Sequence, residues 1–151
     1  MIKKLLTALF AGLGAALSIG LLSLFETSTG GLALLMAPFG ATAVLVFGVP
    51  DSPLAQPKNV IVGHLLTALI GVLFVTYLPI NAITLAVATG AGVSGMLLTR
   101  TTHPPAGANP ILIMLSGQSW LFLVTPVLVG TLVIVMIGRL LQRAKQHVPL
   151  V

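Results

Sequence analysis

The stretch Thr101-Thr-His-Pro-Pro-Ala-Gly-Ala-Asn-Pro110 is polar and rich in helix-breaking residues, and it lies inside an otherwise apolar chain. Part of it belongs to a repeat, because Pro105-Ala-Gly-Ala-Asn-Pro-Ile-Leu112 matches Pro38-Phe-Gly-Ala-Thr-Ala-Val-Leu45 at an offset of 67 residues. The same offset continues without a gap to Gly71 and Gly138, with 12 identities in 34 positions. The chain is therefore predicted to be a duplicated unit whose copies are broken by Pro and Gly at corresponding points.

Composition places the chain in a lipid bilayer. Hydrophobic residues make up 57% of it and charged residues 6%, with a mean hydropathy of +1.15. So few charged side chains cannot cover the surface of a soluble globule. The net charge of +5 does not indicate a nucleic-acid partner, because the basic residues lie at the ends of apolar segments, as topology signals do. The absence of cysteine excludes disulfides and thiolate metal sites.

The apolar residues fall into six segments. The first is interpreted as a membrane helix and not as a signal peptide, because it is too long and no cleavage motif follows it. The second contains a Pro/Gly break, and the fifth is too short to span as a helix unless residues 101–105 are extended. The six segments are Leu5–Phe25, Leu32–Val49, Val60–Ile80, Ala82–Thr99, Pro105–Ser116 and Trp120–Gly138.

Charge distribution favours six crossings. With the N-terminus cytoplasmic, six crossings place all 7 Lys and Arg residues on the cytoplasmic side. If segments two and five instead return to their own side, Lys58 and Arg100 move outside. The prediction is a single all-α membrane domain over 1–151, built as a 3+3 inverted repeat (about 5–80 and 82–138) with a cytoplasmic tail at 139–151. Both termini are expected in the cytoplasm, and a bacterial plasma membrane is the expected location.

The two breaks predict an anion site. Helices are expected to restart near Gly40 and near Gly107 or Asn109, and the first turn of a helix carries unpaired N–H groups and the positive end of the helix dipole. Two such ends converging in an inverted repeat would bind an anion at the middle of the membrane. Thr42 and Asn109 occupy matching positions and add side-chain hydrogen bonds, while Phe39 is a candidate gate. The alternative is that the breaks only kink helices and let them pack closely.

Two histidines are further candidates. His103 precedes Pro104 and Pro105, so its backbone is expected to be extended, and its imidazole can bind an anion, relay a proton or sense pH. Its alternative role is to cap backbone groups that the prolines leave free. His64 is a candidate because ionisable groups inside membranes are usually functional, although it lies near the end of its segment. Arg100 is interpreted as a topology anchor that also attracts anions.

Catalysis and metal binding are not expected. The carboxylates Glu26 and Asp51 fall on opposite sides in the preferred topology, so they cannot form an acid–base pair. The histidines lack the His-x-x-x-His spacing of a helical metal site, and no nucleophile motif is present. The sequence therefore predicts a protein that is not an enzyme and has no cofactor.

The central motifs resemble a known family. Thr102-His-Pro-Pro-Ala-Gly-Ala-Asn-Pro110 is similar to the signature of the HPP family of integral membrane proteins, and Pro38–Leu45 and Pro53–His64 resemble its other recognisable region. The resemblance implies a small polytopic membrane protein, and members in photosynthetic organisms are associated with nitrite transport. The family is commonly described with four spanning helices, which agrees with six segments if the broken ones are not counted. By motif, the positions that the family marks are His103, Pro104, Pro105 and Gly107, followed by Phe39-Gly-Ala41 and Asn59 to His64.

The expected function is a transporter or channel for a small inorganic anion, with nitrite as the leading candidate. The anion would pass between the two helix N-termini, and His103 would tune charge or gating. A homo-oligomer in the bilayer is expected, because one short chain offers little material around a pore. Two alternatives stay open: a channel for small neutral solutes, and a non-transporting assembly protein whose glycine faces bind partner helices.

Overall fold

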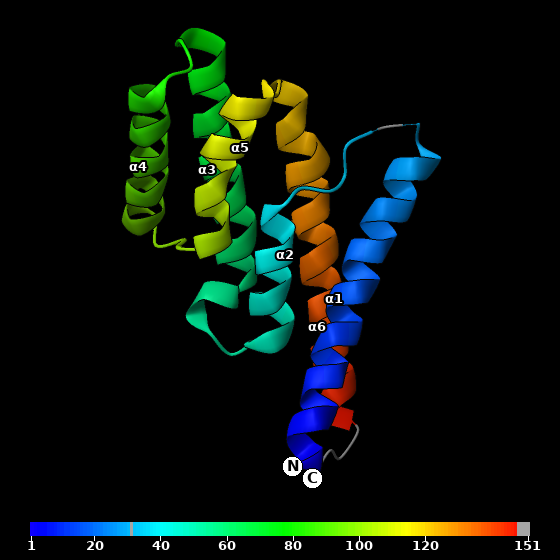
Figure 1. The fold of residues 1–151 in the computed structure, drawn as a ribbon. Helices are drawn as coiled ribbons and strands as arrows, with labels where there is room; N and C mark the ends of the chain where they lie inside the picture. Colours follow the sequence, from blue (N-terminus) through cyan, green and yellow to red (C-terminus); the bar gives the residue numbers. More distant parts are fainter. Residues whose placement is uncertain (31, 148–151) are drawn as a thin grey trace.

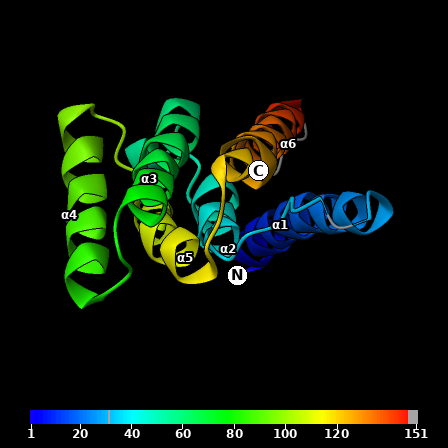
Figure 2. The same cartoon turned by 90° about the horizontal axis from the view of Figure 1, so that it is seen from above.

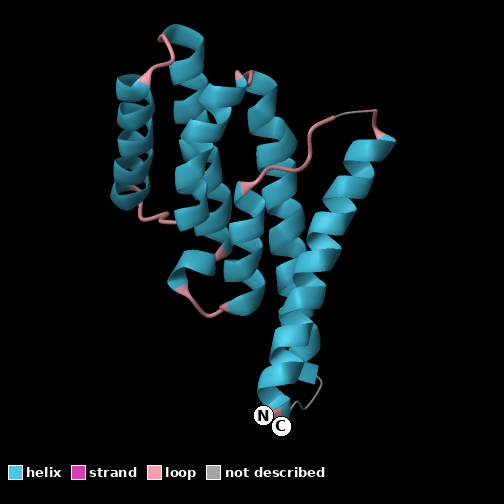
Figure 3. Cartoon of the chain, viewed as in Figure 1, coloured by secondary structure: helices cyan, strands magenta, loops and turns pink. Residues whose placement is uncertain are grey.

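The computed structural model describes residues 1–30 and 32–147, and over these residues the chain is helical and contains no strand (Figure 3). Three helical segments are long and apolar enough to cross a membrane. They are α1 (Ile2–Ser28), α3 (Pro57–Tyr77) and a segment that ends in α6 (Val129–His147). α4 (Ala82–Leu98) is apolar but shorter. The predicted all-α membrane fold is thus confirmed at this level.

The first predicted break is a short helix that begins partway along the molecule. Residues 32–36 are not helical, and α2 (Pro38–Ala43) then continues as π-helical turns in η1 (Val44–Gly48). Pro38 occupies the first turn, where its missing N–H costs nothing. The helix therefore restarts two residues before Gly40, slightly earlier than the sequence predicted.

The second predicted break also begins with non-helical residues, but its helical elements follow in a different order. Residues 101–103 are extended, the 3₁₀ turns of η3 (Pro104–Ala108) follow, and α5 (Asn109–Ser116) completes the segment. The α-helix begins at Asn109, as expected, and Pro104 and Pro105 limit the preceding turns to 3₁₀ geometry because neither can donate a hydrogen bond. Gly117 ends α5 in the left-handed conformation with φ 63°.

Successive segments run in alternating directions along the molecule (Figure 1). The start of α1 and the end of α6 lie at one end, together with the turn η2 (Pro53–Ala55) that leads into α3. α1 packs against α6 and η1, while α4 packs against α3 and α5. Viewed from above, α1 and α4 lie at opposite edges, with the two short helices between them (Figure 2). The broken segments therefore occupy the centre of the fold.

The sixth segment is less regular than predicted. It begins with η4 (Trp120–Leu123) and η5 (Val124–Leu128) before the α-helix starts at Val129. Thr125 has non-helical dihedral angles, φ −127° and ψ 118°. It precedes Pro126, and a residue before proline is disfavoured in the α conformation. The predicted continuous helix from Trp120 to Gly138 is therefore interrupted near its start.

The sequence predicted that the sixth segment ends at Gly138 and that residues 139–151 form a separate tail. α6 instead continues through residue 147 without a break, so the first part of that tail extends the sixth segment. Residues 148–151 lie outside the described part of the chain.

Buried side chains form one apolar core, and many large apolar side chains lie outside it. The core includes Phe39, Val72 and Ile134, each with 0% of its surface exposed. On the outer helices, Leu13 keeps 69% and Ile83 keeps 74% of its surface exposed. Such exposure would favour association in water, but in a bilayer these side chains contact lipid.

Two glycines let the non-helical segments approach the long helices. A Cβ atom on Gly63 of α3 would lie 2.9 Å from the carbonyl oxygen of Thr101. A Cβ atom on Gly130 of α6 would meet the ring of Phe39 and lie 3.3 Å from the carbonyl oxygen of Leu34. Both segments that precede a broken helix therefore lie directly against a glycine.

Arg100 ends α4 at a strained position, which gives a first testable prediction. The N–H of Thr101 donates to the carbonyl of Met96, and the N–H of Arg100 donates to that of Leu97, with Arg100 at φ 54°. This is a Schellman ending, whose left-handed residue is usually glycine. We expect Arg100→Gly to raise the free energy of unfolding by about 1 kcal/mol. Thermal unfolding in detergent would check this, with Arg139→Gly inside α6 as a control that should lower stability; a lower stability for Arg100→Gly would contradict it.

Candidate functional site

Five buried polar side chains meet where the two broken segments contact α3. They are Thr42 of α2, His64 and Thr67 of α3, His103 just before η3, and Asn109 of α5, and each has 0% of its surface exposed. We call this group the histidine–threonine cluster. Ionisable side chains buried in a membrane protein are costly and usually functional.

The backbone of residues 101–103 delivers His103 to the cluster. His103 has φ −136° and ψ 98°, the extended conformation expected before a proline. Asn59 Nδ2 donates to the Thr102 carbonyl over 3.0 Å, which ties this segment to the first turns of α3. Gly63 leaves the space that His103 needs, since a Cβ there would lie 3.0 Å from the His103 Cβ. The segment that carries His103, in the second half of the chain, thus packs directly against Gly63 in the first half.

The Thr42 hydroxyl joins the two histidines. Its Oγ1 lies 2.8 Å from Nε2 of His64, 3.0 Å from Nε2 of His103 and 3.1 Å from the carbonyl oxygen of Pro38. The two imidazole rings also contact each other edge to face, with centroids 4.9 Å apart. One hydroxyl therefore has three hydrogen-bond partners, two of which are titratable.

The partners of each ring fix the positions of the protons. His103 Nδ1 lies 2.8 Å from the carbonyl oxygen of Leu54, which can only accept, so Nδ1 carries the proton and Nε2 of neutral His103 accepts. His64 Nδ1 lies 3.0 Å from Nδ2 of Asn109, a donor, so Nε2 of His64 carries its proton. Nε2–H of His64 then donates to Thr42, and Thr42 donates to Nε2 of His103.

Asn109 orients His64 through its amide. Its Nδ2 lies 3.1 Å from the His64 carbonyl oxygen and 3.0 Å from Thr67 Oγ1, and Thr67 itself donates to the Gly63 carbonyl. If the amide were flipped, Asn109 Oδ1 would lie next to the His64 carbonyl oxygen, and both atoms can only accept hydrogen bonds. The atom that faces His64 is therefore assigned as Nδ2. Asn109 Oδ1 is buried and has no hydrogen-bond partner. An unpaired buried acceptor carries a desolvation cost and marks a place for a further donor.

Phe39 covers the cluster on its apolar side. Its ring is completely buried and packs edge to face on His64, with centroids 5.6 Å apart. It also lies against Gly130, so α6 supports it from behind. Phe39 was predicted as a gate between the two helix ends, and the structure places it between the cluster and the apolar core.

Two of the backbone N–H groups that were predicted to face an anion already have hydrogen-bond partners. The N–H of Gly40 donates to the Ala37 carbonyl over 3.1 Å, and the N–H of Asn109 donates to the Ala106 carbonyl. Short turns thus already satisfy donors that were expected to face an anion. Gly40 and Gly107 face open space, since a Cβ on either would have no neighbour within 4 Å.

The cluster lies closer to the start of α3 than to its end. His64 lies about 10 Å along the axis from the first residue of α3, in a helix about 31 Å long. It is therefore nearer the end of the molecule that holds the start of α1 and the end of α6 (Figure 1).

An apolar groove of about 420 Å³ lies beside the cluster, between the two broken helices. Pro104 and Pro105, predicted as site residues, line it opposite Pro38. The Pro38 carbonyl bonds to Thr42, and Pro105 lies two residues from His103, so the groove and the cluster share backbone. The full lining is Ala37, Pro38, Ala41, Pro104, Pro105, Ala108, Ile111 and Leu112.

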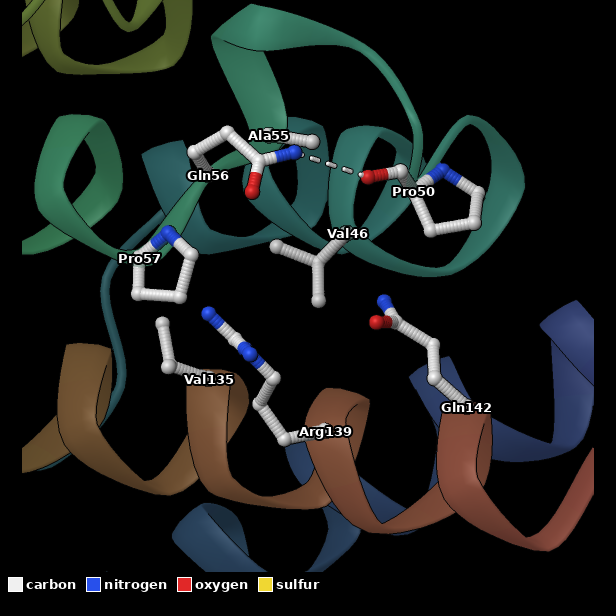
Figure 4. Close-up of a pocket in the computed structure, with 8 residues that line it drawn as sticks. All are labelled: Val46, Pro50, Ala55, Gln56, Pro57, Val135, Arg139 and Gln142. Atoms are coloured by element: carbon white, nitrogen blue, oxygen red, sulfur yellow. Dashed lines mark hydrogen bonds between the residues drawn. The ribbon is translucent and has the colours of Figure 1, made fainter.

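A polar recess lies on the other side of η2 from His103. It has room for about one water molecule, and the side chains of Arg139 and Gln142 point into it from α6 (Figure 4). Gln56 closes it by donating from Nε2 to the Pro50 carbonyl over 3.2 Å. η2 separates this recess from the cluster, because Ala55 lines the recess while the Leu54 carbonyl bonds to His103.

Sequence reasoning missed several members of this site. Thr67 follows His64 by three residues, a spacing that places both on one helix face, so helical periodicity could have identified it. Asn59 was marked only through the family resemblance; its bond to the Thr102 carbonyl, like the role of the Leu54 carbonyl, depends on how segments distant in sequence pack. Within the described residues, no group of three or more His, Cys, Asp or Glu side chains could hold a metal ion.

Comparison with known proteins places the chain in a family. Residues 2–149 match the family described as the HPP transmembrane region. The chain belongs to the HPP family. The resemblance of its central motifs to HPP proteins is thereby confirmed, and it is an integral membrane protein.

Two proteins similar to the chain are described as transmembrane proteins. Both are from Dictyostelium discoideum and are 38% identical to the chain, over 106 and 110 residues. The matches cover 65% and 68% of this chain but 34% and 39% of the two relatives, so the chain spans just over a third of their length. No solved structure matches it.

Proposed function

We propose that the protein carries a small inorganic anion, with nitrite as the leading candidate, across the membrane past the histidine–threonine cluster. The observation that supports this most is the buried Thr42 hydroxyl, which bridges Nε2 of His64 and His103 where two broken helices meet. Interrupted helices of this kind hold the substrate sites of many transporters, and buried ionisable groups line their pathways.

The chemistry of the cluster suits an anion. Thr42, Asn109 and the imidazole N–H groups can all donate hydrogen bonds, and among the described residues no carboxylate is recorded as bonding to them. Asp51 is exposed on the loop before η2, and Glu26 accepts hydrogen bonds from the N–H groups of Leu34 and Leu35. The two carboxylates thus have no shared site, in keeping with transport and not catalysis.

The path of the anion would begin at the recess beside Arg139. The guanidinium there would attract the anion, and displacement of η2 would open the way to His103. In the present arrangement the cluster is fully buried, which corresponds to an occluded state. Release would need the two halves to move apart at the groove between the broken helices, as in alternating access.

Contacts between the halves support the 3+3 inverted repeat. Gly63 contacts Thr101, and Gly130 contacts Leu34. Gly63 and Gly130 are equivalent positions of the repeat, and so are Leu34 and Thr101. In the same way, a Cβ on Gly71 would lie 3.2 Å from Ile113 Cβ, and one on Gly138 would meet Val46. Reciprocal contacts at one sequence offset are expected when a two-fold axis relates the halves.

The repeat suggests how the protein is oriented and assembled. Both termini would face the cytoplasm, because the start of α3, which carries Lys58, and the end of α4, which Arg100 follows, lie towards the end of the molecule that holds the start of α1 (Figure 1). A homo-oligomer would cover the groove between the broken helices, which otherwise faces lipid.

A channel for small neutral solutes is the second candidate. It is favoured by the cluster's hydrogen bonds, which can form with both histidines neutral, and by the unpaired Asn109 Oδ1, which could accept from a neutral solute; among the described residues, no Lys or Arg side chain is recorded as bonding to the cluster. Flux of urea or glycerol that is independent of salt and carries no anion would favour this candidate.

Nitrite uptake into proteoliposomes tests the proposal. We expect protein-dependent uptake that His103→Ala lowers by at least about tenfold, since loss of the imidazole removes the bond to Thr42 and the anchor on Leu54. Ser18→Ala is a matched control, because Ser18 is equally buried but bonds only to the Gly14 carbonyl of its own helix. No protein-dependent flux of nitrite, nitrate, formate or chloride would contradict anion transport.

A further inference from the structure

We infer that His103, held together with His64 on the Thr42 hydroxyl, carries one transported proton on Nε2, so that each anion crosses together with one proton. This inference rests on the proposed anion transport and specifies its coupling. The Thr42 hydroxyl has three hydrogen-bond partners, and it can bond to only two of them at a time when both histidines are neutral.

The neutral cluster leaves one contact of Thr42 unused. A hydroxyl has one proton to donate and two lone pairs with which to accept. With both histidines neutral, Thr42 accepts from His64 Nε2–H and has two acceptors in range for its single proton, Nε2 of His103 at 3.0 Å and the Pro38 carbonyl at 3.1 Å. Only one of these acceptors can be served at a time.

One added proton completes the pattern. If the Thr42 hydroxyl turns to the Pro38 carbonyl, Nε2 of His103 becomes free to bind a proton and then donates it to Thr42 Oγ1. Thr42 now accepts from two Nε2–H groups and donates to Pro38, so all three short contacts are hydrogen bonds of the correct polarity. His103 keeps its other donor bond, from Nδ1–H to the Leu54 carbonyl. The same heavy-atom geometry therefore holds either charge state.

The added charge has no counter-ion among the described residues that contact the cluster. The other groups that contact the two imidazoles are Phe39, Gly63, Asn109 and the Leu54 carbonyl, none of which ionises. The charged side chains that flank these elements, Asp51, Lys58 and Arg100, are exposed. A buried unpaired charge is unfavourable, and so is a bare anion in a neutral buried site. Proton and anion therefore favour each other's binding, and the pair crosses without net charge.

The proton balance is simple. A proton from the aqueous side of entry adds to Nε2 of His103, the anion binds beside the imidazolium, and both leave together on the other side. Thr42 then turns its hydroxyl back to Nε2 of His103, which restores the neutral cluster. No oxidant, reductant or covalent intermediate is required.

The test measures proton and nitrite movement in the same proteoliposomes. A trapped pH dye reports protons, nitrite is assayed directly, and valinomycin with potassium sets the membrane potential. Protein-free vesicles give the correction for unassisted passage of the neutral acid. We expect one proton per nitrite within error, and an initial rate that changes less than twofold when the sign of the potential is reversed.

The outcomes separate the inference from the function on which it rests. Nitrite uptake that moves no protons and follows the membrane potential would overturn the inference while leaving anion transport in place. No protein-dependent uptake of any anion would overturn both. As a second readout, His64→Gln keeps a hydrogen-bonding side chain but removes one imidazole, and we expect it to lower coupled uptake at least tenfold. Wild-type uptake and stoichiometry in His64→Gln would contradict a role for His64 in orienting the hydroxyl that holds the proton on His103.

Discussion

Thr42→Val is expected to reduce nitrite uptake at least about tenfold while leaving the fold intact. Valine has nearly the same shape as threonine, so packing against His64 and Phe39 is kept, but the hydroxyl that bridges the two imidazoles is lost. Nε2–H of His64 then has no acceptor in a fully buried site, and an unsatisfied buried donor costs about 1–3 kcal/mol. If the occluded state bears a cost in the middle of that range, about 2 kcal/mol, the rate falls by about 30-fold.

Two matched variants make this result specific. Thr42→Ser restores the hydroxyl and should recover most of the uptake. Thr131→Val alters the repeat partner of His64, a buried threonine that bonds only to carbonyls of its own segment, and should transport like wild type. Uptake would be measured in proteoliposomes after size-exclusion chromatography shows equal monodispersity. If Thr42→Val transports normally, the hydroxyl bridge has no role in the pathway.

The sequence predicted the members of the cluster better than their arrangement. Thr42, His64, His103 and Asn109 were all identified, because polar residues are rare in an apolar chain and two of them occupy matching positions of a repeat. The predicted anion cradle of backbone N–H groups was different in the structure. Whether those groups stay free depends on turns such as the one from Ala37 to Gly40, and Pro/Gly content does not specify such turns.

The fold shows the same limit. Hydropathy located each helical segment, since every membrane helix must satisfy its own backbone and leave apolar side chains to lipid. It did not predict that Thr125 would interrupt the sixth segment, because proline is often accommodated within membrane helices. Hydropathy also did not predict that Gly63 and Gly130 would each pack against a non-helical segment from the opposite repeat, because that contact depends on tertiary packing.

Gly130→Ala is expected to have the largest effect on stability among the glycine substitutions. The added Cβ would overlap the ring of Phe39, which is fully buried and cannot withdraw without disturbing His64. Forcing a methyl group into a packed core typically costs about 1–3 kcal/mol, and the overlap here is with a rigid ring. We expect a loss at the upper end of that range, measured as thermal or denaturant unfolding in detergent. Gly12→Ala is the control, because a Cβ on Gly12 would have no neighbour within 4 Å.

The overlap also predicts which second change restores stability. Phe39→Leu alone should destabilise the protein, because it leaves a cavity beside His64 and removes an edge-to-face contact. When Phe39→Leu is combined with Gly130→Ala, the shorter leucine leaves room for the added methyl group, so the loss should be smaller than the sum of the single losses by more than about 0.5 kcal/mol. Additive losses would mean that the two residues do not press on each other. Because Phe39 packs on both Gly130 and His64, a coupling of this size would also indicate that α6 holds the cluster closed from behind.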